Sequence, residues 1–188
     1  MNYIAKITLV LFTLLCLGCD KKDDSIPTER VLDVYTASFD LQPQNTSSIW
    51  RHCSFSEDEN HSNFSIRLTD INDDGYRSNV IIIKVPYLSD TCYSVVSKKE
   101  FDSNSSQNLS FSVFYETDHD AIIDYFDIVP SAEATNTLCL TQINEDEIIG
   151  NFSLSFAYDT LRGPSQHPVS NLPSAFSLLN GTFSAGRR

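Results

Sequence analysis

Much of the chain alternates apolar and polar residues with a period of two. The clearest runs are Phe64–Thr69, Leu109–Val113 and Phe152–Tyr158. Because successive side chains of a strand point to opposite faces of a sheet, this pattern predicts strands with one buried face. Val80–Val85 is β-branched and apolar at nearly every position, which is typical of a central strand that is covered on both faces.

Shorter apolar segments predict further strands. They are Val31–Phe39, Ile49–Phe55, Tyr93–Val96, Ile122–Ile128, Leu138–Ile143 and Ala175–Phe183. Turn-forming residues separate these segments, and no stretch of useful length has a helical period. Many short strands at this spacing predict an all-β fold, a single antiparallel β-sandwich or barrel-like domain over residues 31–188.

The N-terminal segment has a different pattern. Lys6 precedes an unbroken apolar run over residues 7–15, and the small Gly18 follows, which is the layout of a secretory signal. The run is shorter than the about 20 residues that a membrane-spanning helix needs. Residues 1–18 are therefore predicted to be a signal peptide that is removed.

Cys16-Leu17-Gly18-Cys19 resembles the lipobox of bacterial lipoproteins, with Cys16 where the family usually has Leu. The resemblance implies that Cys19 carries a lipid, palmitate included, and begins the mature chain; the alternative is a plain signal peptide without lipid. Residues 19–30 would then be a lipidated cysteine and a charged flexible linker. Residues 20–24 look like the Lys-plus-acidic signal of Bacteroidota lipoproteins, which implies a bacterial outer-membrane protein exposed at the cell surface, or alternatively one facing the periplasm.

Two segments near the C-terminal end repeat the pattern G-x-F, at residues 150–152 and 181–183. In each, Gly and Phe share a face, so a neighbouring aromatic ring is expected to cover the space left by the missing side chain. With Trp50 in an early strand and Tyr93 in a later one, the order of features resembles small uncharacterised Bacteroidota lipoproteins. The resemblance implies a β-rich domain outside the cytoplasm and lends no known activity.

The net charge of the chain limits the classes of partner that it can bind. The whole chain has 13 Lys and Arg against 25 Asp and Glu, and removal of residues 1–18 takes away only Lys6, so the formal net charge becomes −13. Nucleic acid repels such a chain, so no nucleic-acid function is expected.

One segment has residues typical of a calcium loop. Asp70, Asn72 and Asp74 place oxygen ligands at alternate positions before Gly75. The twelfth position of such a loop, where calcium loops have a closing Glu, is Ile81. The alternative interpretation is an Asx-rich hairpin turn, which uses the same residue types for turn geometry alone.

No cofactor site, metal site or catalytic residue is predicted from spacing. The histidines, His52, His61, His119 and His167, are scattered without ligand spacing. The acidic residues Asp118, Asp120 and Asp124 would bind a cation, serve acid–base chemistry, or form the solvated end of a strand. A glycosidase site made of two carboxylates is neither identified nor excluded, because no pair of acidic residues stands out in the sequence.

The predicted domain contains three cysteines. Cys53, Cys92 and Cys139 allow one internal disulfide, and the three possible pairings stay open.

Residues 162–173 hold three prolines and no period, which predicts an irregular loop that either recognises a ligand or has no partner.

These features predict a membrane-anchored extracytoplasmic lipoprotein that acts as a non-enzymatic binding or envelope-associated module. Its membrane contact would be the N-terminal lipid, and its ligand a carbohydrate, a protein or an ion. Two alternatives remain: a small glycan-directed hydrolase that uses paired carboxylates, and a barrel-type carrier of a small ligand. An acidic cleft would favour the first alternative, and an enclosed apolar cavity the second.

Overall fold

The computed structural model describes residues 35–59, 63–104, 108–118, 121–129 and 136–188. All described residues belong to one compact unit within residues 33–188. The predicted signal peptide, Cys19 and linker therefore lie outside the described residues. Within the described ranges, no helix is long and apolar enough to cross a membrane.

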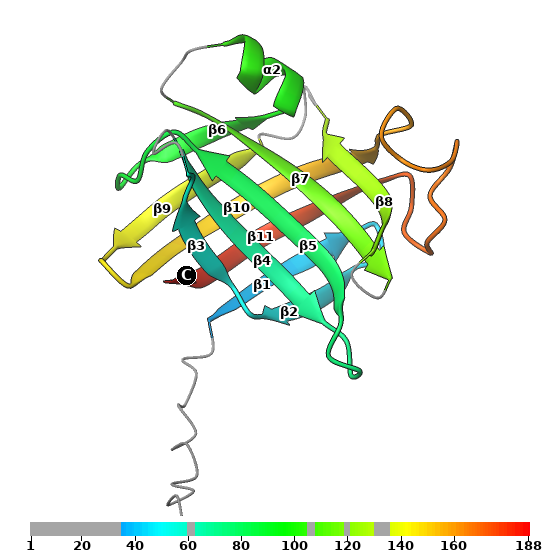
Figure 1. Cartoon of the computed structure of the whole chain (residues 1–188), viewed down its shortest axis with the longest axis horizontal. Coiled ribbons are helices and arrows are strands. Elements are labelled where there is room, and N and C mark those ends of the chain that lie inside the picture. The colour runs from blue at the N-terminus through cyan, green and yellow to red at the C-terminus, as the bar shows by residue number, and fades with distance from the viewer. Residues whose placement is uncertain (1–34, 60–62, 105–107, 119–120, 130–135) are drawn as a thin grey trace, which may run out of the picture. The chain divides into compact units, whose positions relative to one another are not determined.

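Strands dominate the described chain, and one short helix interrupts them (Figure 1). The elements in chain order are β1 (Thr36–Gln42), β2 (Thr46–Arg51), β3 (Ser54–Glu57), β4 (Phe64–Ile71), β5 (Arg77–Val85), β6 (Cys92–Val96), α2 (Lys98–Ser103), β7 (Leu109–Asp118), β8 (Ala121–Ile128), β9 (Thr137–Ile143), β10 (Glu147–Tyr158) and β11 (Ala175–Arg187). The all-β prediction is confirmed.

All of these strands belong to one mixed sheet with the order β2-β1-β11-β3-β4-β5-β7-β6-β9-β10-β8. Two additional pairings join β10 to β11 and β7 to β8. Strand β11 is therefore hydrogen-bonded to β1, β3 and β10. Most pairs are antiparallel, but β3 pairs with β11, and β6 with β7, in parallel. The sheet is therefore mixed, where the sequence pattern predicts an antiparallel one.

The segment Ile49–Phe55 forms two strands instead of the one that was predicted. β2 ends at Arg51 and β3 begins at Ser54, because His52 has a left-handed backbone with φ of 71°. Helix α2 was not predicted, since six residues are too few to show a helical period. The helix begins after Ser97, whose side-chain oxygen accepts the N–H of Glu100 at 3.3 Å.

The inner faces of the strands pack into one large apolar cluster. At its centre the ring of Phe114 lies 5.0 Å from Phe176, 5.6 Å from Phe126 and 6.0 Å from Trp50. On the other side of the same sheet region, Phe111, Val113 and Tyr125 form a second, smaller cluster.

The prediction for β5 is confirmed by these two clusters. Ile81 and Ile83 belong to the large inner cluster, and Ile82, which points to the opposite face, packs against the smaller one. The strand therefore has apolar neighbours on both faces, which explains its nearly continuous apolar sequence.

The two G-x-F segments lie opposite each other on β10 and β11. Gly150 pairs with Phe183, and Phe152 pairs with Gly181. A Cβ atom added to Gly181 would lie 2.4 Å from the Phe152 ring, and one added to Gly150 would lie 2.7 Å from the Phe183 ring. Each ring therefore fills the space that the opposite glycine leaves, and the prediction is confirmed.

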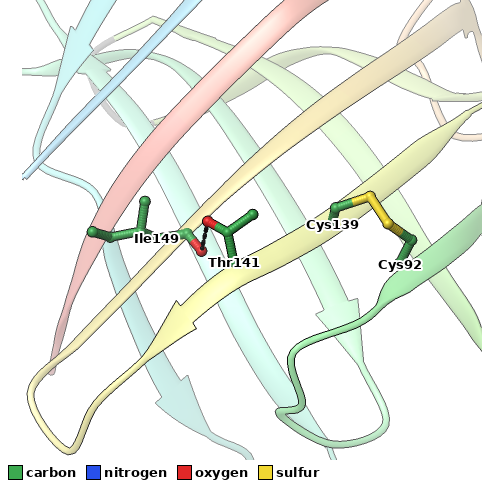
Figure 2. Close-up of a disulfide and its surroundings, with 4 residues drawn as sticks. All are labelled: Cys92, Cys139, Thr141 and Ile149. Atoms are coloured by element: carbon green, nitrogen blue, oxygen red, sulfur yellow. Dashed lines mark hydrogen bonds between the residues drawn. A yellow bond between two sulfur atoms is a disulfide. The ribbon is translucent and has the colours of Figure 1, made fainter.

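One disulfide links the sheet internally. Cys92 of β6 lies directly opposite Cys139 of β9, and their sulfur atoms are bonded (Figure 2). In the same view, the Thr141 hydroxyl donates to the carbonyl of Ile149 at 3.3 Å and ties β9 to β10. Cys53 is a buried free thiol, and burial raises its pKa to about 12.

Candidate functional site

The predicted calcium segment forms the hairpin between β4 and β5. The Asn72 side-chain oxygen accepts the N–H of Tyr76 at 2.9 Å, and the Asn72 carbonyl accepts the N–H of Gly75 at 2.9 Å. The Asp70 carboxylate accepts the hydroxyl of Ser78 at 2.9 Å. In the described ranges, no group of three or more His, Cys, Asp or Glu side chains is arranged to hold a metal ion. The oxygens of Asp70 and Asn72 thus serve the turn, as the turn interpretation expects.

The predicted acidic patch of Asp118, Asp120 and Asp124 is described only in part, and the structure brings Asp124 next to an acidic residue outside that patch. His61, His119 and Asp120 lie outside the described residues. Asp124 of β8 is completely buried and pairs in register with Glu116 of β7, which the sequence did not single out. Opposed residues of an antiparallel pair have Cβ atoms about 5 Å apart, so the two carboxyl groups are neighbours.

Asp124 attaches the long loop between β10 and β11 to the sheet. One carboxylate oxygen accepts the N–H of Val169 at 3.0 Å, and the other accepts the N–H of Ser170 at 2.9 Å. Both oxygens of a buried charge are therefore used by the backbone of one segment. Hydrogen bonds to a charged acceptor are stronger than neutral ones, so this attachment fixes the middle of the loop.

Glu116 lies beside this attachment. Burial raises the pKa of the Glu116 carboxyl, the negative charge of Asp124 raises it further, and a hydrogen bond with the Ser170 side chain opposes both effects. Its Oε2 atom is buried and has no hydrogen-bond partner among the described residues. The folded state therefore holds the proton of Glu116 more tightly than water-exposed surroundings would.

The first turn of the loop is also fixed. The Asp159 carbonyl accepts the N–H groups of Arg162 at 3.2 Å and Gly163 at 2.7 Å. The Tyr158 hydroxyl donates to the carbonyl of Ser165 at 3.1 Å. A Cβ atom added to Gly163 would lie 2.2 Å from that hydroxyl oxygen, so only glycine allows this close approach.

A second group of side chains lies on the outer face of the sheet, and we call it the arginine–tyrosine face: Arg67 of β4, Tyr115 of β7, Tyr125 of β8 and Arg162 of the loop. The rings of Tyr115 and Tyr125 are 5.0 Å apart in an edge-to-face arrangement. The Arg162 guanidinium lies 5.0 Å from the centre of the Tyr125 ring and donates to the Tyr125 hydroxyl. It also lies 3.7 Å from the Asp159 carboxylate.

Arg67 has a different environment from Arg162. It is half-buried, and within the described ranges the structure gives its guanidinium no hydrogen bond or ion pair. Burial lowers the pKa of Arg67, and the positive charges of Arg188 and Arg77 lower it further, against the opposing effect of Tyr115. Burial also raises the pKa of Tyr115 and of Tyr125, so both phenols stay neutral.

A shallow groove of about 520 Å³ lies over β10 and β11. Its polar lining includes Asn151, Ser153, Asn180 and Thr182. Asn180 donates from its side chain to the Asp40 carboxylate at 3.0 Å, and this bond, with one from Ser47, lowers the pKa of Asp40. The described residues that line the groove supply hydroxyl and amide groups and include no charged side chain.

No family model, curated protein or solved structure matches this chain. The resemblance to Bacteroidota lipoproteins therefore stays a prediction from Cys19 and the strand pattern.

Proposed function

We propose that this chain is a lipoprotein, anchored through Cys19 to a bacterial outer membrane and displayed at the cell surface, whose all-β domain acts as a non-enzymatic binding module. The anchor is proposed from the apolar run and lipobox-like sequence before Cys19. More than one acyl chain gives stable membrane attachment, so a lipidated Cys19 would hold the domain at the membrane.

The attached loop carries the proposal of a binding role. The carboxylate of Asp124 is completely buried, and it accepts hydrogen bonds from two backbone N–H groups of this one segment. A loop that is ordered before binding loses less conformational entropy when a ligand arrives, which favours affinity. Binding residues are often found on such loops, held by a rigid sheet.

The same loop exposes apolar side chains. Leu161 is 94 % exposed and Val169 is 66 % exposed, and both flank segments that hydrogen bonds hold in place. An apolar side chain that is fixed in water has much to gain from burial against a ligand or partner. The loop therefore combines a fixed backbone with unburied apolar surface, which supports recognition as its role.

The carboxylate pair supports a binding role more than hydrolysis. A glycosidase needs both carboxyl groups to face the scissile bond of a sugar. Here both oxygens of Asp124 accept backbone N–H groups, and the residue has no exposed surface. Likewise, a carrier needs internal space, whereas Phe114, Phe126 and Phe176 are in ring contact on the inner face.

Metabolic labelling with radioactive palmitate in the native host tests the anchor. We expect label on the wild-type chain and none on Cys19→Ala, because the acylated thiol would be gone. Cys53→Ala is the matched control, since it removes a buried cysteine of the same chain. Label that persists on Cys19→Ala would contradict the anchor.

Protease treatment of intact cells tests the display. Trypsin should cut the exposed loop after Arg162 without lysis, and replacement of residues 21–24 by alanine should abolish that cleavage by retaining the protein inside. Arg162→Gln removes the cleavage site and identifies the product. A loop that is cut only after lysis would contradict display at the surface.

A further inference from the structure

The shallow groove of about 520 Å³ lies on the outer face of the sheet, where β9, β10 and β11 run side by side (Figure 1). Strand β10 is the middle strand, since it pairs with both of the others. Ser153 of β10 lies opposite Thr137 of β9, and Asn151 of β10 lies opposite Thr182 of β11. The groove is therefore built from side chains of three strands that one hydrogen-bonded ladder fixes relative to each other.

A β-bulge opens the groove on the side of β11. The register between β10 and β11 shifts beside Ser153, so Leu179 and Asn180 together stand opposite this one residue. Asn180 has a left-handed backbone with φ of 53°, and its side chain donates to the Asp40 carboxylate of β1 at 3.0 Å. The Asn180 amide therefore reaches toward β1, and the small Ser153 leaves the space between the two strands open.

The polar groups at the rim of the groove are held in place before a ligand arrives. The two oxygens of the Asp40 carboxylate accept hydrogen bonds from Asn180 at 3.0 Å and from the Ser47 hydroxyl at 2.7 Å. The hydroxyls of Thr182 and Ser38 are 2.9 Å apart and hydrogen-bonded. Asn180 and Thr182 are exposed to water in spite of these bonds. Side chains that are already ordered lose less conformational entropy when they bind a ligand.

The lining of the groove matches the chemistry of a sugar. The hydroxyls of Thr137, Ser153 and Thr182 and the amide of Asn151 each donate as well as accept hydrogen bonds. A sugar carries hydroxyl groups on neighbouring carbon atoms, and these groups also donate and accept. The half-buried Leu179 adds apolar surface, against which the C–H groups of a sugar ring can pack.

Charge and backbone pairing disfavour other ligands here. The described residues of the lining carry no charge, while hydrogen bonds from Asn180 and Ser47 lower the pKa of Asp40 and keep a negative charge at the rim. With a formal net charge of −12 for the whole chain, this carboxylate repels phosphorylated and carboxylated molecules. A peptide that binds by strand addition needs an unpaired strand edge, but β10 is paired with β9 and β11 along this stretch.

We propose that this groove binds a neutral saccharide through the side chains of Asn151, Ser153 and Thr182. The site goes beyond the role proposed for the loop of residues 162–173, because it lies on a different part of β10 and β11 and its lining is mainly polar. A shallow site that relies on a few hydrogen bonds binds a single sugar weakly. Many copies of the chain on one surface would hold a polymer of repeating sugars more tightly, which suits the proposed display at a membrane.

Calorimetric titration of the purified full chain tests the proposal, in a detergent whose head group is not a sugar. The probes are four neutral polysaccharides, dextran, laminarin, mannan and arabinan, with polygalacturonate as the charged comparison. We expect saturable binding of at least one neutral polymer and none of polygalacturonate. The Kd should stay the same between about 0.05 and 0.5 M salt, because screening acts on charge pairs and this recognition uses none.

Variants assign the binding to the groove. Asn151→Ala and Thr182→Val each remove one hydrogen-bonding group and should weaken binding about twofold to tenfold. Ser153→Gln keeps a polar side chain but fills the groove, so it should abolish binding. Asn171→Ala is the matched control, since it removes an exposed amide of the loop that is not part of the lining. It should bind like the wild type, and all variants should unfold like the wild type.

Several results would overturn the proposal. They are failure of all four neutral polymers to bind, equal or tighter binding of polygalacturonate, a Kd that rises steeply with salt, and wild-type affinity of both Asn151→Ala and Ser153→Gln. Weaker binding by Asn171→Ala, with Asn151→Ala unchanged, would move the sugar to the loop and overturn it as well. Cys19→Ala should bind with unchanged affinity, so this titration and the palmitate labelling succeed or fail independently.

Discussion

The glycine at position 181 offers a sharp test of how the core is packed. In Gly181→Ala, the new methyl group would lie 2.4 Å from one carbon of the Phe152 ring and 2.6 Å from two others. Carbon atoms in contact are at least about 3.5 Å apart, so the ring would have to move by roughly 1 Å. Phe152 is only 3 % exposed and contacts Phe39 and Phe183, which leaves it little room.

The expected cost follows from this clash. Overpacking of a buried site destabilises a protein by about 1–3 kcal/mol. For a chain of this size each kcal/mol lowers the melting temperature by about 2–4 °C, so the midpoint should fall by about 2–12 °C. Thermal unfolding followed by circular dichroism measures it, and urea unfolding supplies the free energy directly.

A double-mutant cycle separates the clash from other effects. Phe152→Ala removes the ring, at a cost of about 3–5 kcal/mol, and Gly181→Ala should then cost little. Gly75→Ala is the control: nothing lies within 4 Å of its added methyl group, and its cost comes from a φ of +84°. That cost should be the same with and without Phe152. If Gly181→Ala costs the same in both backgrounds, the reasoning about reciprocal glycine–ring packing is refuted.

Two further predictions concern titratable groups. Because burial raises the pKa of Glu116 above 4.5, the folded chain binds this proton more tightly than the unfolded chain, and stability is lost as pH rises from about 4.5. Glu116→Gln should therefore gain melting temperature relative to the wild type between pH 4 and pH 7, unlike Glu145→Gln at an exposed turn; a constant difference across this range would contradict the burial of Glu116. The pKa of about 12 for Cys53 predicts that iodoacetamide modifies this thiol only after denaturation, and Cys92 and Cys139 only after reduction as well, as peptide mass spectrometry will show. Modification of native Cys53 at neutral pH would count against its burial.

The strands were predictable because a strand that is buried on one face alternates apolar and polar residues along the sequence. Phe152–Tyr158 and Phe64–Thr69 fall inside β10 and β4. The two G-x-F segments predict that an aromatic ring covers each glycine, while the pairing of Gly150 with Phe183 and of Phe152 with Gly181 is known only from the register. These signals are local, since each depends on which face a side chain takes.

Other features depend on contacts that a local pattern does not record. The parallel pair of β3 and β11 joins residues more than 130 positions apart, so its direction has no local signal. The Cys92–Cys139 pairing follows from the register of β6 on β9. The break at His52 depends on a single left-handed residue, which is not a glycine.

The candidate site was the least predictable part. Arg67, Tyr115, Tyr125 and Arg162 come from three strands and a loop, and no spacing along the sequence joins them. Asp124 was named in an acidic patch, but its partner Glu116 was not, because only the register of β7 on β8 makes the two neighbours.

The place of β11 in the sheet has a consequence for how the chain folds. This strand pairs with β1, β3 and β10, so residues 36–42 reach their final hydrogen bonds only when residues 175–187 are available. Contacts between such distant segments slow folding, because a long loop has to close first. A polypeptide built in this way stays open while it is being synthesised, which is the condition in which threading through a translocation pore is easiest.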